Sequence, residues 1–538
     1  MPSIVKLTEP TLFRQQALID GEWRDAADGA CFAVHNPANA EIVGHAPRCS
    51  MRDTERAIEA AHAAFAGWRT TSAKNRAQLL RRWFDLILAH RDDLAAIMVS
   101  EQGKPLAEAR GEIDYAASFI EWFAEEARRV YGDVVPSPWA DRRMLTLKQP
   151  VGVAALITPW NFPAAMLTRK AGAALAAGCT VVVKPASQTP FTALALAELA
   201  QRAGLPPGVL NVVTGDAATI GGVLTSHPLV RKVSFTGSTL VGKQLLAQSA
   251  STLKHVSLEL GGNAPFIVFD DADLDAAVAG TVASKYRNSG QTCVCANRVF
   301  VHEAVFDAFA EKFAHAVAQL KVGNGFEAGT EVGPLVNTAA LEKVEWHIAD
   351  ALARGAKLLT GGARHALGGQ FFQPTVLSHC TSDMQVCRDE TFGPVAPLIR
   401  FADEAEVIRT ANDTDYGLAA YAYTRDLGRA WRLAEQLDYG MVGINAGVIS
   451  TAEAVFGGVK QSGLGREGGR SGIDAYLESK YVNLGGLGQV ATSARPMARP
   501  GRPSASSPRC TSAYSNSIAR YTRPALLRAS SSAVCRCI

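Results

Sequence analysis

Short apolar runs alternate with longer stretches rich in Ala and Leu between residues 151 and 235, and this alternation restricts the possible folds more than any other feature of the chain. It is typical of a parallel sheet whose strands are joined by crossover helices, an arrangement that usually builds a nucleotide-binding domain. The predicted strands cover residues 151–157, 180–184, 209–213 and 230–235, and the predicted helices cover 164–177, 190–203 and 217–225.

A second alternating block runs from residue 264 to about residue 446, with strands predicted at 265–268, 298–301 and 440–444. We expect it to form a separate α/β domain, which the length of 538 residues allows. The join between the blocks lies near Leu260 and would place Cys293 close to a cleft between domains, where ligand sites tend to form.

The charge balance gives no reason to expect a nucleic-acid partner. The formal net charge is +3, but eight arginines lie in residues 485–538, which contain no Lys, Asp or Glu. Without those eight charges the rest of the chain has a net charge of −5.

Because residues 485–538 also have five prolines, clustered serines and no periodicity, we expect a disordered tail. A basic arm for an anionic surface is the alternative.

The ten cysteines have no framework spacing and no secretory signal begins the chain, which favours a reducing, cytoplasmic setting. The longest uncharged apolar run, 150–168, contains three prolines. We therefore expect a strand and a loop there, and no membrane span.

Cys293 is the strongest single candidate for chemistry. It lies in the stretch 288–298 among glycine and small polar residues, which favours the access that a nucleophilic thiolate needs. The alternative for an isolated cysteine is a small buried apolar residue.

Three other stretches strengthen this hypothesis. Asn161, in the run 158–163 after the first predicted strand, offers an amide that stabilises an oxyanion. The run 235–242 follows a predicted strand and begins a predicted helix, a position that favours binding of a phosphate group. A tight turn without a ligand would have the same sequence pattern. Glu259 is a carboxylate in an apolar stretch, where burial raises the pKa and favours general-base work. The spacing Gly463-x-Gly465-x-x-Gly468 has no hydrophobic strand before it, so we discount it.

Taken together, these stretches closely resemble the aldehyde dehydrogenase superfamily over residues 15–484. The segments that carry the resemblance are 158–163, 235–242, 258–263, 290–298, 390–394 and 456–467. The resemblance implies an aldehyde dehydrogenase-like α/β fold with two doubly wound α/β domains and a small β bridging or oligomerisation element. The implied parts are an NAD(P)-binding domain (1–130 and 149–261), a catalytic domain (262–473) and the bridging element (131–148 and 474–484), which in the family pairs subunits into dimers or tetramers.

The resemblance also implies a mechanism. The Cys293 thiolate attacks an aldehyde, Asn161 and the Cys293 backbone N–H hold the oxyanion, hydride passes to a nicotinamide, and Glu259 activates the water that releases the acid. The matching cofactor positions are Trp160, Asn161, Lys184, Pro185, Ala186, Ser187, Gly237, Ser238, Leu260, Glu390 and Phe392.

Ser187 favours NADP as the cofactor, with NAD as a possible second one. Members of the family that prefer NAD often have a glutamate at this position, which repels a 2′-phosphate. A serine beside Lys184 accepts that phosphate.

Within the superfamily, the chain is most similar to the succinate-semialdehyde dehydrogenases. In that subfamily two arginines and a serine bind the remote carboxylate of the substrate, and Arg169, Arg287 and Ser450 match them. Cys295 is also typical of the subfamily, where a reversible disulfide with Cys293 is one hypothesis and a packing role the other. No metal is implied.

Several alternatives remain at this level. A glutarate-semialdehyde dehydrogenase differs by one methylene of pocket length, and a broader aldehyde dehydrogenase would lack the arginine clamp. A CoA-acylating relative is disfavoured because Glu259 is retained for hydrolysis. A non-catalytic binding or structural protein on the same fold is disfavoured because Cys293, Glu259 and Asn161 are all present.

Overall fold

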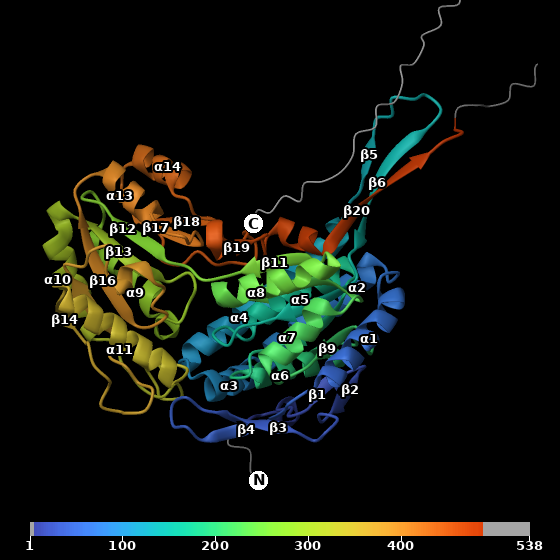
Figure 1. Cartoon of the computed structure of the whole chain (residues 1–538), viewed down its shortest axis with the longest axis horizontal. Helices are drawn as coiled ribbons and strands as arrows, with labels where there is room; N and C mark the ends of the chain where they lie inside the picture. The colour runs from blue at the N-terminus through green and yellow to red at the C-terminus, as the bar shows by residue number, and fades with distance from the viewer. Residues whose placement is uncertain (1–4, 488–538) are drawn as a thin grey trace, which may run out of the picture.

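The computed structural model describes residues 5–487, and two large sheets form the body of the molecule (Figure 1). Five parallel strands form the centre of the first sheet, and short antiparallel strands close both of its edges. Their order across the sheet is β19 (Gly463–Leu464), β11 (His255–Glu259), β10 (Val230–Thr236), β7 (Val153–Ile157), β8 (Thr180–Lys184), β9 (Leu210–Val212), β1 (Ala17–Ile19) and β2 (Glu22–Arg24).

The central strands are apolar throughout because helices cover both faces of the sheet. Side chains alternate along β7: Val153, Ala155 and Ile157 pack in one core with helices α1, α7 and α8. Ala154 and Leu156 point the other way, into a core shared with α2 to α6. The helices are α1 (Met51–Trp68), α2 (Ala73–Ala89), α3 (Arg91–Gln102), α4 (Leu106–Glu126), α5 (Ala165–Ala177), α6 (Pro190–Arg202), α7 (Ala217–Ser226) and α8 (Thr239–Ser249).

The second sheet has seven strands, six of them parallel to their neighbours. Their order is β14 (Lys357–Thr360), β15 (Thr375–Ser378), β16 (Val395–Phe401), β13 (Ala296–His302), β12 (Ala264–Val268), β17 (Ala419–Tyr423) and β18 (Met441–Ile444). Two cores flank this sheet, one on each face. Its helices are α9 (Leu274–Tyr286), α10 (Phe306–Ala318), α11 (Thr338–Ala353), α12 (Gln385–Arg388), α13 (Glu404–Asn412) and α14 (Leu427–Gln436).

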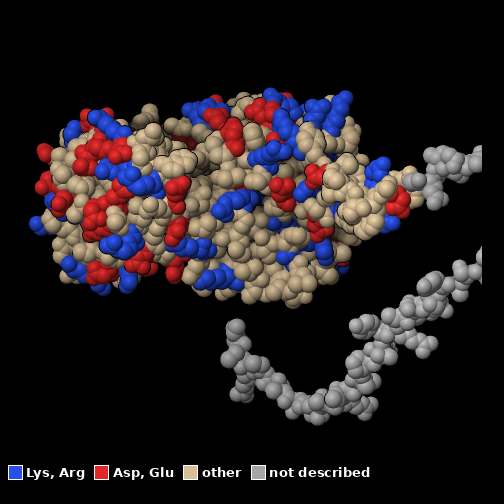
Figure 2. Space-filling view, turned by 90° about the horizontal axis from the view of Figure 1, so that it is seen from above, with Lys and Arg blue, Asp and Glu red and all other residues tan. Residues whose placement is uncertain are grey.

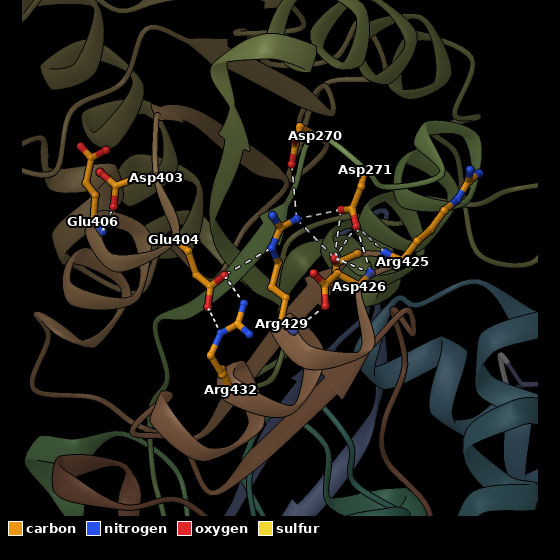
Figure 3. A network of polar contacts seen from close by, with 10 residues as sticks. Asp270, Asp271, Asp403, Glu404, Glu406, Arg425, Asp426, Arg429 and Arg432 are labelled. Atoms are coloured by element: carbon orange, nitrogen blue, oxygen red, sulfur yellow. Dashed lines mark hydrogen bonds and ion pairs between the residues drawn. The ribbon is translucent and has the colours of Figure 1, made fainter.

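An ion-pair network joins α13 and α14 to the end of β12 (Figure 3). Arg429 on α14 donates to Asp271 at 2.9 Å and reaches Glu404 at 3.4 Å. Glu404 also accepts two hydrogen bonds from Arg432, at 2.6 and 2.7 Å. Such a network fixes the position of two surface helices relative to the sheet. All of its residues lie in the second half of the chain, and none of them lines the cavity described below.

A three-stranded antiparallel sheet projects from the body as an arm (Figure 1). It consists of β20 (Leu477–Leu484), β6 (Arg143–Pro150) and β5 (Asp133–Val135), and a further pair, β3 (Cys31–His35) and β4 (Ile42–Pro47), lies near the N-terminus. Large apolar side chains are exposed on the arm, with Val134 at 75% and Tyr481 at 57%.

The predicted α/β fold with a doubly wound first sheet and a small β element is confirmed. Strand 180–184 has the predicted bounds, and the strand predicted at 151–157 begins at Val153, because Gly152 before it has a φ of +131°. The sequence indicates short strands with a turn at residues 17–23, which are β1 and β2, but their place at the edge of the first sheet was not predicted. The other edge strand, β19, has only two residues and is too short to show a period. The predicted disordered tail lies, from residue 488 on, outside the described residues.

Figure 2 shows Lys and Arg interspersed with Asp and Glu over the face that it presents, without a large patch of one sign. Within residues 5–487, no helix is long and apolar enough to cross a membrane. The same residues contain no group of three or more His, Cys, Asp or Glu arranged to hold a metal ion.

Candidate active site

The strand order places the candidate site where the direction of the first sheet's winding reverses. The chain runs from β7 outward through β8 and β9, and then returns to the other side of β7 as β10 and β11. The segments that follow β7 and β10 therefore lead to opposite faces of the sheet, into α5 and α8, and ligands bind at such points in open α/β sheets. The run 158–163 follows β7, and Gly237 and Ser238 follow β10.

A cavity of about 300 Å³ lies at this point and is lined from both halves of the chain. Trp160, Asn161, Gly237, Ser238 and Leu260 come from the first half, and the second half contributes Cys293, Glu390, Phe392 and Ser450. Arg169 and Arg287 also line it. Of the predicted site residues, Glu259, Cys295 and the run Lys184 to Ser187 do not line the cavity itself.

Cys293 sits on a tightly bent loop between α9 and β13. Asn288, Ser289 and Gly290 have φ values of +52°, +58° and +75°, three consecutive left-handed residues. A Cβ at Gly290 would lie 2.2 Å from the Gly393 carbonyl oxygen, so only glycine fits. Strained backbone of this kind persists only where the surrounding structure requires it. Here the bent loop places the half-buried Cys293 side chain in the cavity lining.

Hydrogen bonds tie this loop to the loop that carries Asn161. The Asn161 amide donates to the Gln291 carbonyl at 2.9 Å, and the Asn288 amide donates to the Asn161 carbonyl at 3.0 Å. Lys104, in the segment between α3 and α4, donates to the same Asn161 carbonyl at 2.8 Å and forms a buried ion pair with Glu112 on α4. The positions of Asn161 and Cys293 are therefore set by one connected network.

Burial raises the pKa of the Cys293 thiol to about 12, and the carboxyl groups of Glu390 and Glu259 raise it further while Arg169 lowers it. The thiol is therefore protonated at neutral pH as it stands in this structure. Below this pKa the thiolate fraction grows about tenfold with each pH unit.

We predict that alkylation of Cys293 by iodoacetamide accelerates steadily from about pH 7 to about pH 10 without levelling off, because the reactive thiolate keeps increasing over that range. Peptide mass spectrometry measures the labelling rate, and the exposed Cys31 in the same sample reports on reagent quality. A plateau near pH 8 would show that the thiol ionises far more easily than its burial implies.

Glu259 ends β11 and is 2% exposed. Within residues 5–487 neither of its carboxyl oxygens has a hydrogen-bond partner, and burial, together with Glu467, raises its pKa well above the usual range. The direction of this shift agrees with the predicted one. Glu259 does not line the cavity in this structure.

Arg169 is more constrained than the sequence suggested. Its side chain is fully buried on α5, where Nε donates to Glu467 at 2.7 Å and the guanidinium lies 4.0 Å from the centre of the Phe456 ring. Nη1 is buried and has no partner. Arg287 is half-buried with its Nε also buried and unpaired, and its guanidinium lies 5.5 Å from the Phe162 ring. Ser450 lines the same cavity.

The predicted cofactor residues follow the carboxyl ends of neighbouring strands. Lys184 ends β8, is 3% exposed and has no hydrogen-bond or ion-pair partner within the described part of the chain. Burial lowers the pKa of Lys184 to about 8. Pro185 and Ala186 follow it, and Ser187 donates to the Gly215 carbonyl at 2.9 Å. A buried cation without a partner is an incomplete arrangement that an anionic or hydroxyl-bearing ligand would complete.

The other predicted cofactor residues lie along the cavity. A Cβ at Gly237 would lie 2.4 Å from the Phe235 ring, so a larger residue does not fit there unless that ring moves. The Ser238 hydroxyl caps α8. Glu390 accepts a hydrogen bond from the Gly262 N–H at 3.0 Å, and burial raises its pKa to about 7. The Trp160 and Phe392 rings meet edge to face at 5.6 Å.

Cys295 is buried and does not line the cavity. Its sulfur lies 3.4 Å from the Gly290 carbonyl oxygen and 3.9 Å from the Lys285 ammonium. A disulfide with Cys293 stays a prediction.

Two polar residues stand out among those at or beside the site that sequence analysis missed. Tyr115 on α4 lines the cavity, and its helical spacing made it indistinguishable from a core residue. Glu467 binds both Arg169 and Lys170, and it was visible only as part of a glycine-rich motif.

Comparison with known proteins agrees with this geometry. The model of the aldehyde dehydrogenase family matches residues 23–482. The glutarate-semialdehyde dehydrogenase of Pseudomonas aeruginosa is 62% identical over 483 residues, covering 90% of this chain and 100% of the relative. The NADP(+) succinate-semialdehyde dehydrogenase of Escherichia coli is 61% identical over 481 residues, covering 89% and 100%.

A solved structure, that of succinate-semialdehyde dehydrogenase from Burkholderia pseudomallei, superposes with a TM-score of 0.89 at 64% identity. The match covers 89% of this chain and 100% of that one.

Proposed function

Because the chain belongs to the aldehyde dehydrogenase family, we propose that it oxidises succinate semialdehyde to succinate and reduces NADP, with NAD as a second cofactor. The observation that carries the substrate is the pair of buried, unpaired donors, Arg169 Nη1 and Arg287 Nε, on residues that line the cavity with Cys293. An unpaired buried donor is costly, and a carboxylate is the group that pairs best with a guanidinium.

In the proposed reaction the Cys293 thiol first loses its proton to solvent water. The thiolate sulfur then forms a bond to the aldehyde carbon, and the electron pair of the broken C–O π bond moves to the carbonyl oxygen, which becomes an oxyanion. The Cys293 backbone N–H and the Asn161 amide donate to that oxygen, since only one of the two Asn161 N–H groups is needed for the Gln291 carbonyl. The bound dinucleotide supplies the hydride acceptor. Cys293 is then acylated as a thioester, and Glu259 takes a proton from the water that releases the acid and returns the thiol.

Three features support a dinucleotide with a 2′-phosphate. Lys184, at the end of β8, is nearly buried and has no hydrogen-bond or ion-pair partner within residues 5–487. Ser187 beside it is neutral, so no carboxylate repels a phosphate at that position. Gly237 and Ser238 open α8, where free N–H groups attract the charge of a phosphate. Glu390 and Phe392 would contact the nicotinamide end.

Glutarate semialdehyde is the second candidate substrate, because relatives of both names match equally well. One methylene changes the binding free energy by only about 1–3 kcal/mol, and the same two arginines serve either carboxylate.

The proposed subunit pairing through the arm of β5, β6 and β20 is supported by its exposed apolar side chains. A cytoplasmic location stays a prediction. The seven cysteines in the described part of the chain are all free, which agrees with it.

We predict that kcat/KM for succinate semialdehyde exceeds that for butanal, which lacks the carboxylate, by at least about a hundredfold, since two charge-assisted contacts are lost with butanal. With the same aldehyde, we further expect kcat/KM for NADP to exceed kcat/KM for NAD. Initial rates followed at the absorbance of the reduced nicotinamide measure both ratios, with glutarate semialdehyde as the third aldehyde. Equal kcat/KM values for butanal and succinate semialdehyde would contradict the proposed carboxylate site. A clear preference for glutarate semialdehyde would show that it, and not succinate semialdehyde, is the substrate.

A further inference from the structure

A third unpaired donor lies on the same cavity as the two arginines. Within the described part of the chain the Tyr115 hydroxyl is buried without a hydrogen-bond partner, as are Arg169 Nη1 and Arg287 Nε, and all three residues line the cavity. Native structures leave few buried polar groups unpaired, so three in one cavity lining indicate a missing acceptor. Thr236 is a fourth such group in the lining, but it ends β10 beside Gly237, on the proposed dinucleotide side.

Rigid packing holds the Tyr115 ring in place. It projects from the middle of α4 and lies 4.8 Å from the Phe119 ring, one helical turn further along. Phe119 in turn faces the Arg169 guanidinium at 5.8 Å. Tyr115 and Arg169 are therefore supported by the same aromatic side chain, and neither needs a large rearrangement to meet one ligand.

The phenol has the protonation state that a donor requires. Burial raises the pKa of Tyr115, while Arg169 and Arg287 close by lower it. Because burial dominates, the hydroxyl stays protonated at neutral pH and donates to an anion.

We propose that Tyr115 is the third donor to the remote carboxylate of the substrate and determines the preference for carboxylated aldehydes together with Arg169 and Arg287. This inference rests on the proposed function. A carboxylate has two oxygens and about four acceptor positions, so it accepts two guanidinium N–H groups and one phenol at once.

The test is the Tyr115→Phe variant, which removes only the hydroxyl. We expect kcat/KM for succinate semialdehyde to fall about tenfold to a hundredfold, mainly through KM, because a hydrogen bond to a charged group is lost. For butanal, kcat/KM should stay within about twofold of the parent, since butanal offers no carboxylate to this hydroxyl. The inhibition constant of succinate, as a competitive inhibitor, should rise by the same factor by which kcat/KM for succinate semialdehyde falls. Tyr131→Phe is the matched control, because Tyr131 is 66% exposed and does not line the cavity.

The outcomes separate the two proposals. If the parent enzyme does not prefer succinate semialdehyde to butanal, the proposed function fails and the role of Tyr115 fails with it. If the parent has that preference and Tyr115→Phe loses activity equally on both aldehydes, the proposed function stands and Tyr115 is only structural. If the variant loses neither activity nor succinate inhibition, the carboxylate binds without Tyr115.

Discussion

Replacing Cys293 by serine should lower kcat at least about a thousandfold while leaving the protein folded, because removing a nucleophile forfeits the covalent route. Cys293 lies on the cavity wall, and its loop is held by the Asn161 and Asn288 hydrogen bonds, which the substitution does not touch. A serine hydroxyl is a far weaker nucleophile than a thiolate under the same conditions. Initial rates with succinate semialdehyde and NADP measure the loss, and the thermal midpoint reports on folding.

Cys295→Ser is the matched control, since Cys295 is two residues away, buried, and absent from the cavity lining. We expect that variant to keep activity of the same order as the parent. A Cys293→Ser protein with parent-like activity would show that the nucleophile is another group, and a loss in Cys295→Ser as large as in Cys293→Ser would show that the loop, and no single thiol, is essential.

Replacing Glu467 by glutamine should destabilise the folded chain by about 3–5 kcal/mol, because it leaves two buried cations without their counter-charge. Glu467 binds Arg169 at 2.7 Å and also Lys170, and both cationic side chains are fully buried on α5. It further accepts a hydrogen bond from Ser234 on β10 at 3.0 Å. Burial alone would raise the pKa of Glu467, but Lys170 and Arg169 lower it to about 2, so the carboxylate stays charged at neutral pH.

The stability that this carboxylate contributes is present above about pH 4 and is lost as the pH falls toward 2, since its pKa is lower in the folded than in the unfolded chain. Urea midpoints at neutral pH compare the variant with its parent. Glu121→Gln is the control, because its ion pair with Arg81 is exposed on both sides and should contribute no more than about 1 kcal/mol. Equal shifts in the two variants would contradict a structural role for the buried carboxylate.

The central strands and the loops that follow them were predictable from local pattern alone. A strand buried on both faces must be apolar along its whole length, which is why β7, β8 and β10 were visible as continuous runs. Since parallel strands present their carboxyl ends at one edge, the runs containing Asn161, Lys184 and Gly237 were expected to meet there. The structure places all three at that edge.

The surroundings of these residues were not predictable in the same way. Arg169 and Glu467 are 298 residues apart in the chain, and only the return of the C-terminal segment against β11 brings them together. Tyr115 has the spacing of an ordinary core residue, and its unpaired hydroxyl becomes visible only when α4 and α5 pack beside the cavity. The sequence by itself determined the parallel strands, the crossover helices between them and the residue types that follow the strands, because hydrophobic period and strand length are local properties. Tertiary structure alone decided which charges are paired, which donors are left free and which thiol is kept neutral, because burial and hydrogen bonding depend on neighbours that are distant in the chain.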